Sequence, residues 1–337
     1  MNNTIPYQKI DGNQSWTAPV TRERYNNDLT ASEGDARIRS EQLVKRFGAT
    51  TALNINYSQI MAGSIYGLVG PNGAGKSTYL RTMAGIYRPD SGLCEMDDQT
   101  IWENPAIKSR ILFLPDQPSF LPHSTLLQMK RFYQGVYPHF SHQIYRELLE
   151  TFGLDESAKL KTFSKGMMRQ GALCLVIAAQ PDLLLLDEAF DGLDPVMRRA
   201  LRRILSQLVL EHNMTVVISS HNLRELEDLC DHVGVLHNGN MIIEQDLDDL
   251  KLGICRIQVA WEQALGIQDL QNMGLNIVDY KRQGSVLQLI ISGDRQEITQ
   301  RLRTTSPLLL EALPLTLEEI FIQTMEVNGY DIRHILG

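Results

Sequence analysis

The part of this 337-residue sequence best suited to chemistry is a glycine-rich segment that ends in a lysine and two hydroxyl side chains. It lies between a β-like apolar run, Ser64–Val69, and a helix-like segment, Tyr79–Ala84. In this setting glycines let successive backbone N–H groups turn inward around phosphate oxygens, and the helix start adds partial positive charge. The full match to GxxxxGK[ST] favours a phosphate-binding loop over a turn with a merely solvated lysine. The segment consists of Gly70, Pro71, Asn72, Gly73, Ala74, Gly75, Lys76, Ser77 and Thr78.

Three side chains at the end of this loop have separate expected roles. We expect Lys76 to bridge the β- and γ-phosphates of a nucleotide, and the Ser77 hydroxyl to ligate Mg²⁺. Thr78 is a second phosphate donor. The sequence therefore predicts a site for a nucleoside triphosphate and Mg²⁺.

Two adjacent acids follow a run of four leucines, Leu183–Leu186. Such a run is typical of a buried parallel strand, and its carboxyl end is where nucleotides bind in α/β sheets. We expect Asp187 to hold Mg²⁺ and Glu188, which points the other way by strand alternation, to polarise the attacking water. Without the upstream loop, a core strand emerging into solvent would explain the pattern equally well.

A histidine follows a third strand-like run, Thr215–Ser219. His221 would face the same edge of the sheet, where it can hydrogen-bond the γ-phosphate and position water. A lone histidine at a strand end is more often structural, so this assignment depends on its order in the chain. Cys230, His232 and His237 match no zinc-ligand spacing.

The elements that must position these residues alternate along the chain. Short apolar runs separated by helix-length segments predict a largely parallel sheet covered on both faces. We expect a main domain over residues 38–245, a polar N-terminal extension over 1–37, and a small α/β appendage over 246–337. In the appendage, Arg256–Ala260 and Val286–Ile291 are strand-like, and Arg295–Arg303 and Leu317–Met325 are helix-like.

Composition limits the classes of partner. A hydrophobic content of 43% and a charged content of 21% are ordinary for a globular α/β protein. The net charge of −8 gives little reason to expect nucleic-acid binding. No apolar run approaches the ~20 residues of a spanning helix and no secretory signal is visible, so the cytoplasm is the expected compartment. The four widely spaced cysteines are expected to be reduced core thiols: Cys94, Cys174, Cys230 and Cys255.

Taken together, these motifs resemble those of ABC ATPases over about Ile38–Gln245. The segment Phe163–Gln170 looks like a variant of the family's signature loop and lies between the phosphate-binding loop and the acidic strand. The segment Gly192–Pro195 is similar to the D-loop, and Ser219–His221 to the switch loop. The elements occur in the family's order.

This resemblance implies the fold of a P-loop NTPase ABC cassette. Such a cassette has a RecA-like parallel core, an antiparallel β subdomain and a helical signature subdomain, here at about 120–172. It also implies a dimer with a second ABC cassette, either another copy or a homologue. Ser164 and Gly166 would then bind the γ-phosphate of ATP held by the facing subunit, and Asp194 would lie at the nucleotide in the D-loop.

Two further residues are assigned by the resemblance. Phe47 is the candidate for stacking on adenine, since a π-face suits a purine, although a Phe there could equally be a core residue. Gln117 is the candidate Q-loop residue, facing Mg²⁺ and the attacking water, with Asp116 as the alternative register.

The sequence also departs from the family pattern. Lys165 and Met167 replace the usual Gly and Gln of the signature, which changes how the loop meets nucleotide. Ala189 and Phe190 replace a frequent Pro-Thr pair, a change expected to serve packing. Near the end, Leu315–Phe321 resembles a segment of cassettes that serve ABC-2 type exporters, and Tyr137–Phe140 favours the same subclass. An amphipathic helix packed on the core would also explain both patterns.

The predicted function is that of an ATP-binding and ATP-hydrolysing subunit of an ABC transporter, with Lys76, Gln117, Glu188 and His221 as catalytic residues. It would work on a separate transmembrane permease at the cytoplasmic face of the membrane, with export as the expected direction. A soluble ABC ATPase with a mechanical role is the alternative. A non-hydrolysing ATP-binding regulator is disfavoured by Glu188.

Overall fold

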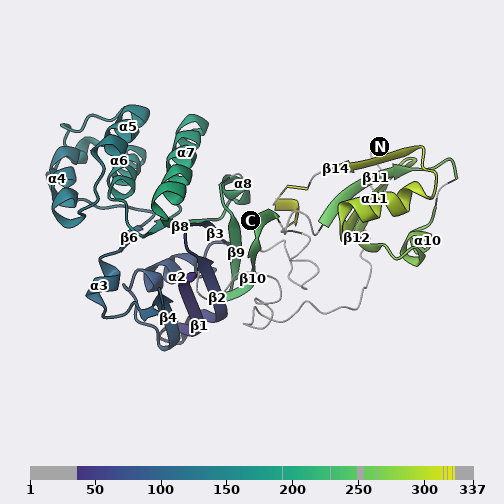
Figure 1. The fold of residues 1–337 in the computed structure, drawn as a ribbon, viewed down its shortest axis with the longest axis horizontal. Coiled ribbons are helices and arrows are strands. Elements are labelled where there is room, and N and C mark those ends of the chain that lie inside the picture. The colour runs from purple at the N-terminus through teal and green to yellow at the C-terminus, as the bar shows by residue number, and fades with distance from the viewer. Residues whose placement is uncertain are drawn as a thin grey trace. The chain divides into compact units, whose positions relative to one another are not determined.

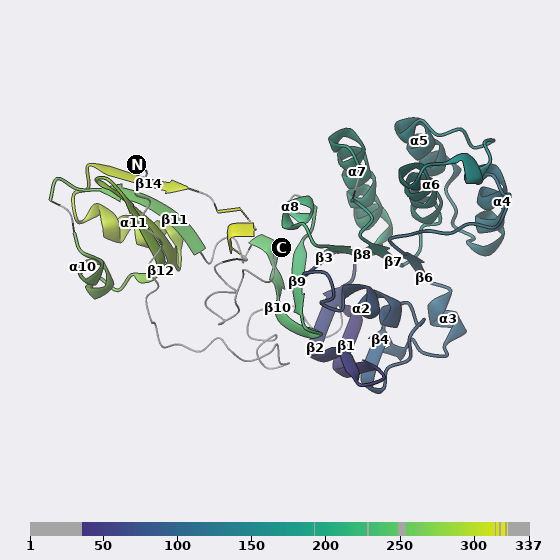
Figure 2. The same cartoon turned by 180° about the vertical axis from the view of Figure 1, so that it is seen from behind.

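The computed structural model describes residues 36–191, 193–227, 229–248, 254–263, 265–313, 315–316, 318–320 and 322. The chain divides between Gln245 and Asp246 into two compact units (Figures 1 and 2). The predicted polar extension lies outside the described residues, except for Ala36 and Arg37, which begin the first strand. No helix among the described residues is long and apolar enough to cross a membrane.

A six-stranded sheet forms the centre of the larger unit. Its order is β10-β9-β3-β8-β7-β6, and the pairs β9/β3, β3/β8, β8/β7 and β7/β6 are all parallel. Every residue of β3, β7 and β8 is buried, which is why these strands read as continuous apolar runs. The strands are β3 (Ile65–Val69), β6 (Ile111–Leu114), β7 (Leu183–Asp187), β8 (Thr215–Ser220), β9 (His232–His237) and β10 (Asn240–Asp246).

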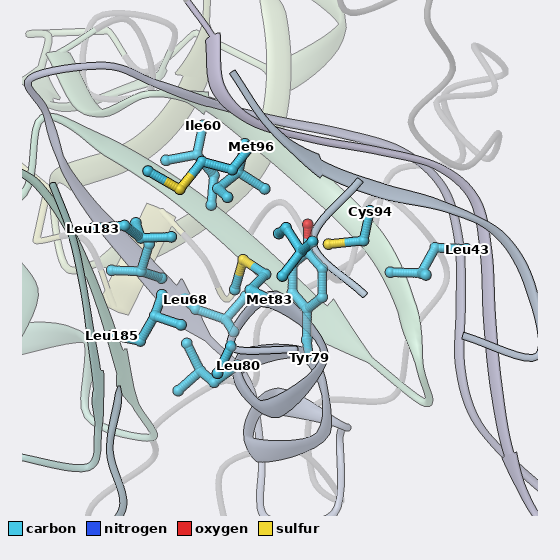
Figure 3. Packing of buried hydrophobic residues seen from close by; sticks show 14 of the residues in the cluster. Leu43, Ile60, Leu68, Tyr79, Leu80, Met83, Cys94, Met96, Leu183 and Leu185 are labelled. Atoms are coloured by element: carbon cyan, nitrogen blue, oxygen red, sulfur yellow. The ribbon is translucent and has the colours of Figure 1, made fainter. Parts of the chain in front are cut away.

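A second, antiparallel sheet has the order β2-β1-β4-β5. Helix α2 (Lys76–Met83) packs between the two sheets and supplies Tyr79, Leu80 and Met83 to one continuous core (Figure 3). Leu68 and Leu185 meet this helix from the parallel sheet. Both sheets thereby fix the orientation of the helix whose first residue is Lys76. The remaining elements here are β1 (Ala36–Phe47), β2 (Thr50–Met61), β4 (Ser91–Met96), β5 (Gln99–Thr100) and α3 (Pro105–Lys108).

A helical group follows β6 in the chain. It contains α4 (Leu126–Val136), α5 (His142–Phe152), the 3₁₀ turn η2 (Leu160–Thr162) and α6 (Lys165–Ala178). Side-chain oxygens of Thr125, Ser141 and Ser164 cap the three α-helices. Helix α6 continues to Ala178, so the helical group extends beyond residue 172, the end that was expected from the sequence. Helices α7 (Pro195–His212) and α8 (Leu223–Leu226) come next.

The smaller unit has one sheet with the order β12-β13-β11-β14, and all of its pairs are antiparallel. The chain order βαββαβ with this strand order is the split βαβ arrangement of ferredoxin-like folds. Three of its elements, β11, β13 and α11, lie where the sequence patterns predicted them. The bounds are β11 (Ile254–Ala260), α10 (Ile267–Asn272), β12 (Asn276–Gln283), β13 (Val286–Ser292), α11 (Arg295–Arg303) and β14 (Leu309–Leu313).

The segment that resembled an exporter-type ending is partly described. Thr316 and Glu319 cap each other's backbone N–H groups, which starts a helical turn, and Ile320 is fully buried. Glu319 also accepts a hydrogen bond from Arg256 of β11 at 2.8 Å. Packing therefore accounts for Thr316, Glu319 and Ile320, while Leu317 and Phe321 lie outside the described residues.

All four cysteines are free and buried, as expected from sequence. Burial raises the pKa of the Cys94 thiol to about 12 and that of Cys255 to about 11. The predicted packing role of Ala189 and Phe190 is likewise confirmed, since both side chains are buried.

Candidate functional site

The glycine-rich loop between β3 and α2 has a conformation that depends on its glycines. Gly75 precedes the helix with φ +109°, a left-handed backbone that side chains rarely adopt. A Cβ on Gly70 would lie 2.2 Å from the carbonyl oxygen of Leu236 in β9. The loop therefore packs closely against the sheet and leads directly into the N-terminus of α2, where backbone N–H groups are available to an anion.

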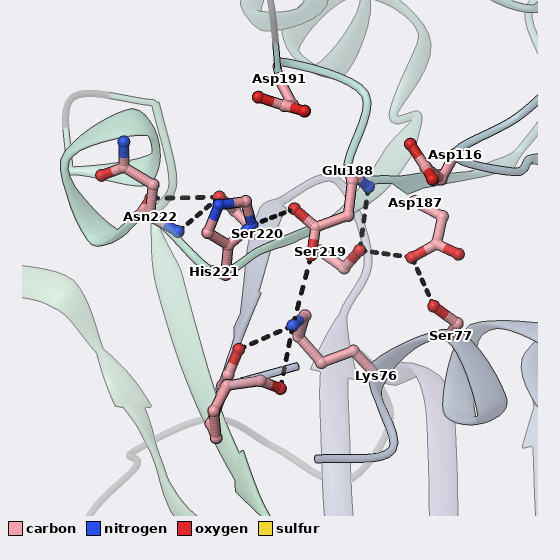
Figure 4. A network of polar contacts seen from close by, with 12 residues as sticks. Lys76, Ser77, Asp116, Asp187, Glu188, Asp191, Ser219, Ser220, His221 and Asn222 are labelled. Atoms are coloured by element: carbon pink, nitrogen blue, oxygen red, sulfur yellow. Dashed lines mark hydrogen bonds and ion pairs between the residues drawn. The ribbon is translucent and has the colours of Figure 1, made fainter. Parts of the chain in front are cut away.

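Lys76 is buried at the first turn of α2, and its ammonium group bends back over the loop. Nζ donates to the carbonyl oxygens of Gly70 at 2.6 Å and Pro71 at 3.3 Å. It also lies 3.3 Å from Glu188 Oε1. The lysine predicted to grip phosphates is thus placed next to the acid predicted to activate water (Figure 4).

Asp187, the last residue of β7, is 1% exposed and holds two hydroxyl groups. Its Oδ1 accepts hydrogen bonds from Ser77 Oγ at 3.0 Å and from Ser219 Oγ at 2.7 Å. The hydroxyl and the carboxylate expected to share a magnesium ion are therefore adjacent (Figure 4). A buried carboxylate is tolerated here because these donors compensate for lost solvent.

Glu188 lies between two cationic or polar partners. One carboxylate oxygen faces Lys76, and the other lies 2.8 Å from His221 Nδ1, which follows β8. The structure thus joins the ends of β7 and β8 to the phosphate-binding loop. We call Lys76, Ser77, Asp187, Glu188 and His221 the strand-end cluster.

The backbone of Glu188 departs from what strand alternation predicted. Strand β7 ends at Asp187, and Glu188 has a left-handed φ of +50°. Its N–H donates to both the carbonyl and the hydroxyl oxygen of Ser219, at 3.2 and 3.1 Å. The two acids point apart because the chain turns at Glu188, and such non-glycine outliers concentrate at functional sites.

The donor set at Asp187 fits magnesium bound together with a nucleotide. Mg²⁺ prefers oxygen ligands and is usually held by one or two carboxylates plus substrate phosphates. Ser77 and Asp187 supply a hydroxyl and a carboxylate oxygen 3.0 Å apart. Both oxygens belong to elements that the sheet and the core hold in place.

Phe47, the candidate for adenine stacking, ends β1 and is 45% exposed. Its ring meets Tyr87 edge-on at 5.2 Å, and Lys45 Nζ lies 5.4 Å from its centroid. Phe47 is therefore at the surface and absent from the main core cluster. Its exposure leaves ring surface for a purine.

The two candidates for the Q-loop differ in their surroundings. Gln117 is exposed, three residues beyond the end of β6. Asp116 forms an ion pair with Arg169 of α6, and this arginine also donates to the carbonyl oxygen of Asp191 at 2.5 Å. Asp116 is thus held by the helical group, whereas Gln117 projects to solvent.

The signature residues lie at the start of α6, the helix that also carries Arg169. Ser164 is the N-cap of α6 and accepts from the Met167 N–H at 3.2 Å, and both Ser164 and Gly166 are exposed. They are not part of the strand-end cluster of their own chain. Asp194 caps α7 by accepting from Val196 and Met197, both at 2.9 Å, and Gly192 lies outside the described residues.

A second polar network lies in the core, where Tyr79 of α2 is buried. Tyr79 Oη bonds Ser40 and Ser58, both at 3.0 Å, and Ser58 donates to Glu244 Oε1 at 2.7 Å. Tyr66 donates to the same oxygen at 2.5 Å. Burial raises the pKa of the Glu244 carboxyl to about 7. We call these five residues the buried hydroxyl network.

Sequence reasoning assigned no role to Ser219 or Arg169. Ser219 contacts Asp187 and Glu188, and Arg169 contacts the loops after β6 and β7. The residues in these contacts lie far apart in the sequence, so local patterns do not predict them. A serine two residues before the candidate histidine was the only signal for the first. For Arg169 the signal was its position on the helix that begins after Ser164. Hydrophobic periodicity does not predict which loops such a polar side chain contacts.

Comparisons with known proteins agree with this geometry. The family model described as "ABC transporter" matches residues 53–191. The ABC transporter ATP-binding protein YtrB of Bacillus subtilis is 31% identical over 285 residues, which cover 85% of this chain and 97% of that protein. The bacitracin transport ATP-binding protein BcrA of Bacillus licheniformis is 35% identical, over 64% of this chain and 71% of its own length. The daunorubicin/doxorubicin resistance ATP-binding protein DrrA of Streptomyces peucetius is 33% identical, over 64% and 66%.

Solved structures share the fold of the larger unit. An ATP-binding subunit of an ABC transporter is 26% identical, with a TM-score of 0.58, and the match covers 64% of this chain and 91% of that one. A dimeric ATP-binding cassette in a post-hydrolysis state with ADP and Pi has a TM-score of 0.55 at 22% identity. That match covers 62% of this chain and 98% of the cassette.

Proposed function

The chain belongs to the ATP-binding subunits of ABC transporters and is an ATPase, and from that premise we propose that it dimerises around two ATP–Mg²⁺ and drives a separate membrane permease as an exporter. The single observation that carries the mechanism is the position of Glu188 between Lys76 and His221, at 3.3 and 2.8 Å. These contacts gather the phosphate-binding lysine, an acid and a histidine at adjacent strand ends.

In the proposed reaction, Lys76 and the N-terminal amides of α2 bind the β- and γ-phosphates. Glu188 orients and polarises the attacking water, and His221 holds Glu188 and reaches the γ-phosphate. Magnesium, when bound, neutralises charge on the phosphates, and Ser77 and Asp187 are the residues that would hold it. Phe47 offers a ring face to adenine, and Gln117 is the proposed Q-loop residue.

The proposed dimer follows from where the signature residues lie. Ser164 and Gly166 are exposed at the start of α6 and do not contact the strand-end cluster of their own chain. A second cassette, whether another copy or a homologue, would place them against the γ-phosphate of the facing site. Asp194, at the start of α7, would lie at the same seam.

The proposed permease and the direction of transport draw on the relatives and on the surface. The relatives' names describe bacitracin transport and daunorubicin/doxorubicin resistance. Phe132 and Val136, one turn apart on α4, are 55% and 53% exposed, which suits burial by a partner. We propose that this face of the helical group meets a cytoplasmic segment of the permease, so that the chain works at the cytoplasmic side of the membrane.

Replacing Glu188 by Gln tests the proposed mechanism. The amide keeps the shape of the side chain but cannot accept the water proton, so we expect steady-state hydrolysis to fall at least about 100-fold while ATP binding persists. ATP should then hold the variant as a dimer in size-exclusion chromatography. Glu150→Gln, on the exposed side of α5, is the matched control and should hydrolyse ATP normally. Undiminished hydrolysis by the Glu188 variant would remove Glu188 from the mechanism.

Reconstitution tests the permease. The chain should hydrolyse ATP faster when a candidate multispanning partner is supplied in proteoliposomes, and Phe132→Asp should abolish that stimulation without changing basal hydrolysis. If the stimulation survives this substitution, the permease contacts another surface of the chain. A chain that hydrolyses ATP but responds to no membrane partner would favour the mechanical role without transport.

A further inference from the structure

We propose that Arg169 is a positioning residue that couples the start of α6, with Ser164 and Gly166, to the loops that follow β6 and β7. The inference rests on the proposed function, because it assigns Arg169 the task of transmitting events at one nucleotide site to the signature residues that serve the facing site. Arg169 itself touches neither phosphate nor water in this account.

The geometry places one guanidinium group among acceptors from two loops. Arg169 Nη2 donates to the backbone oxygen of Asp116 at 3.1 Å and forms an ion pair with its carboxylate. Nη1 donates to the backbone oxygen of Asp191 at 2.5 Å and lies 3.7 Å from its carboxylate. Asp116 is two residues beyond β6, and Asp191 is three residues beyond Glu188.

The loop after β7 connects Arg169 to the catalytic acid through a single turn. The Asp191 N–H donates to the carbonyl oxygen of Glu188 at 3.2 Å. A change in the turn at Glu188 therefore moves an acceptor that Arg169 holds. The loop after β6 carries Gln117 directly next to Asp116, so both loops held by Arg169 carry a proposed reaction residue.

The first half of α6 is less buried than the second half. The buried residues of this helix run from Gly171 to Ala178, whereas Lys165 to Gln170 are exposed or only partly buried. In this first half, Arg169 makes the charged contacts with the loops after β6 and β7, and the neutral side chain of Gln170 donates to Met197 Sδ of α7 at 3.1 Å. The contacts that tie this half of α6 to the two loops are therefore polar ones, which can be remade when a loop shifts.

Arginine suits this task for a physical reason. Its planar guanidinium presents several donors in fixed directions, so that one side chain can hold acceptors on two loops at once. The Arg169 side chain is only 15% exposed, although Asp116 and Asp191 are more open to solvent. A lysine at this position would keep the charge but lose the fork.

The test compares Arg169→Met with Arg169→Lys and with Arg203→Met, each made in the full chain. Arg203 lies on α7 and forms an ion pair with Glu147, so its replacement removes the same charge from a surface far from the loops. The measurements are ATP binding to the monomer, kcat and KM for hydrolysis, the thermal midpoint, and ATP-dependent dimerisation in a Glu188→Gln background.

We expect Arg169→Met to bind ATP as the wild type does but to need about tenfold more protein to dimerise, with kcat reduced by about tenfold and KM little changed. Arg169→Lys should recover part of the dimerisation, and Arg203→Met should behave as the wild type. The thermal midpoints of the two methionine variants should agree within a few degrees.

Two results would overturn the inference and keep the proposed function. One is dimerisation and kcat at wild-type levels in Arg169→Met. The other is a large fall in the thermal midpoint of Arg169→Met together with loss of ATP binding, if Arg169→Lys restores both fully. A merely structural role of Arg169 predicts that pattern. If the Glu188→Gln parent itself stays monomeric with ATP, the proposed dimer fails, and the inference fails with it.

Discussion

The strand-end cluster and the buried hydroxyl network both include residues of α2, yet they are built from different chemistry. The strand-end cluster contains charges of both signs, and its members range from the buried Lys76 to the 49% exposed side chain of His221. The buried hydroxyl network contains one ionisable carboxyl, Glu244, surrounded by tyrosine and serine hydroxyls. No cation is bonded to Glu244 among the contacts of the described residues.

This difference assigns different tasks to the first residues of α2 and to Tyr79. Ion pairs such as Lys76–Glu188 can be exchanged for contacts to phosphate, so that they suit a site that changes partner during a reaction. Neutral hydrogen bonds in a dry interior gain little from exchange but cost much when broken, and thus they fix geometry. We infer that Tyr79 sets the orientation of α2 so that Lys76 and Ser77 meet their ligands.

Replacing Lys76 by Ala breaks the strand-end cluster and should have the largest effect. The ammonium group is the only cation that contacts Glu188 from α2, and its loss removes charge compensation for the phosphates. We expect hydrolysis to fall more than about 100-fold and ATP affinity to fall at least about tenfold. The thermal midpoint should change little. Hydrolysis within a fewfold of the wild type would contradict this assignment.

Ser219→Ala tests whether the acids need their shared support. The substitution removes the hydroxyl that donates to Asp187 and accepts from the Glu188 N–H. We expect kcat to fall about tenfold and the Mg²⁺ concentration for half-maximal rate to rise, because misplaced ligands typically cost 10–100-fold. Ser220→Ala, which removes a hydroxyl bonded to Asn222, is the control. A Mg²⁺ dependence identical to that of the wild type would show that Asp187 does not need Ser219.

Tyr79→Phe breaks the buried hydroxyl network without touching the charged side. Ser40 and Ser58 each lose a partner inside the core, which should cost about 1–3 kcal/mol of unfolding free energy. The main effect should therefore appear in the thermal midpoint, and ATP hydrolysis by the folded protein should fall by less than about fivefold. Unchanged stability together with a large loss of hydrolysis would show that Tyr79 serves the reaction and not the geometry of the core.

Glu244→Gln removes the ionisable carboxyl of the buried hydroxyl network and should have the smallest effect, visible in the pH dependence of stability. The pKa of this carboxyl rises from an ordinary 4.5 to about 7 in the folded chain, so that the folded state binds its proton more tightly. The resulting stabilisation is full below pH 4.5 and is lost as the pH rises through 7. We expect the wild type to lose several degrees more than the variant between pH 5 and 8. If the thermal midpoints of the wild type and the variant change with pH in parallel, a group other than Glu244 causes the pH dependence.

Features that rest on local pattern were predictable from sequence. The buried strands read as apolar runs because neighbours cover both faces, and the phosphate-binding loop followed from the glycines and lysine between a strand and a helix. Placing Asp187 and His221 at the same sheet edge needed only the rule that parallel strands share a carboxyl end. These inferences use local motifs and a general rule for parallel strands, without any contact between particular side chains.

Features that join distant parts of the chain were not predictable. Ser58 and Glu244 come from two different sheets, and Arg169 of α6 meets Asp116 and Asp191 in the loops after two neighbouring strands. The left-handed turn at Glu188 is held by hydrogen bonds to Ser219 in another strand. Strand alternation was therefore the wrong explanation for the opposite directions of Asp187 and Glu188. The pairing order of the smaller unit likewise follows from contacts that hydrophobic periodicity does not encode.

The most direct test of the dimeric mechanism is a structure of the Glu188→Gln variant with ATP and Mg²⁺. We predict that Ser164 of one subunit lies about 3 Å from the γ-phosphate held by Lys76 of the other, within hydrogen-bonding distance. An ATP-bound structure in which Ser164 faces solvent, with each nucleotide enclosed by a single chain, would contradict the account.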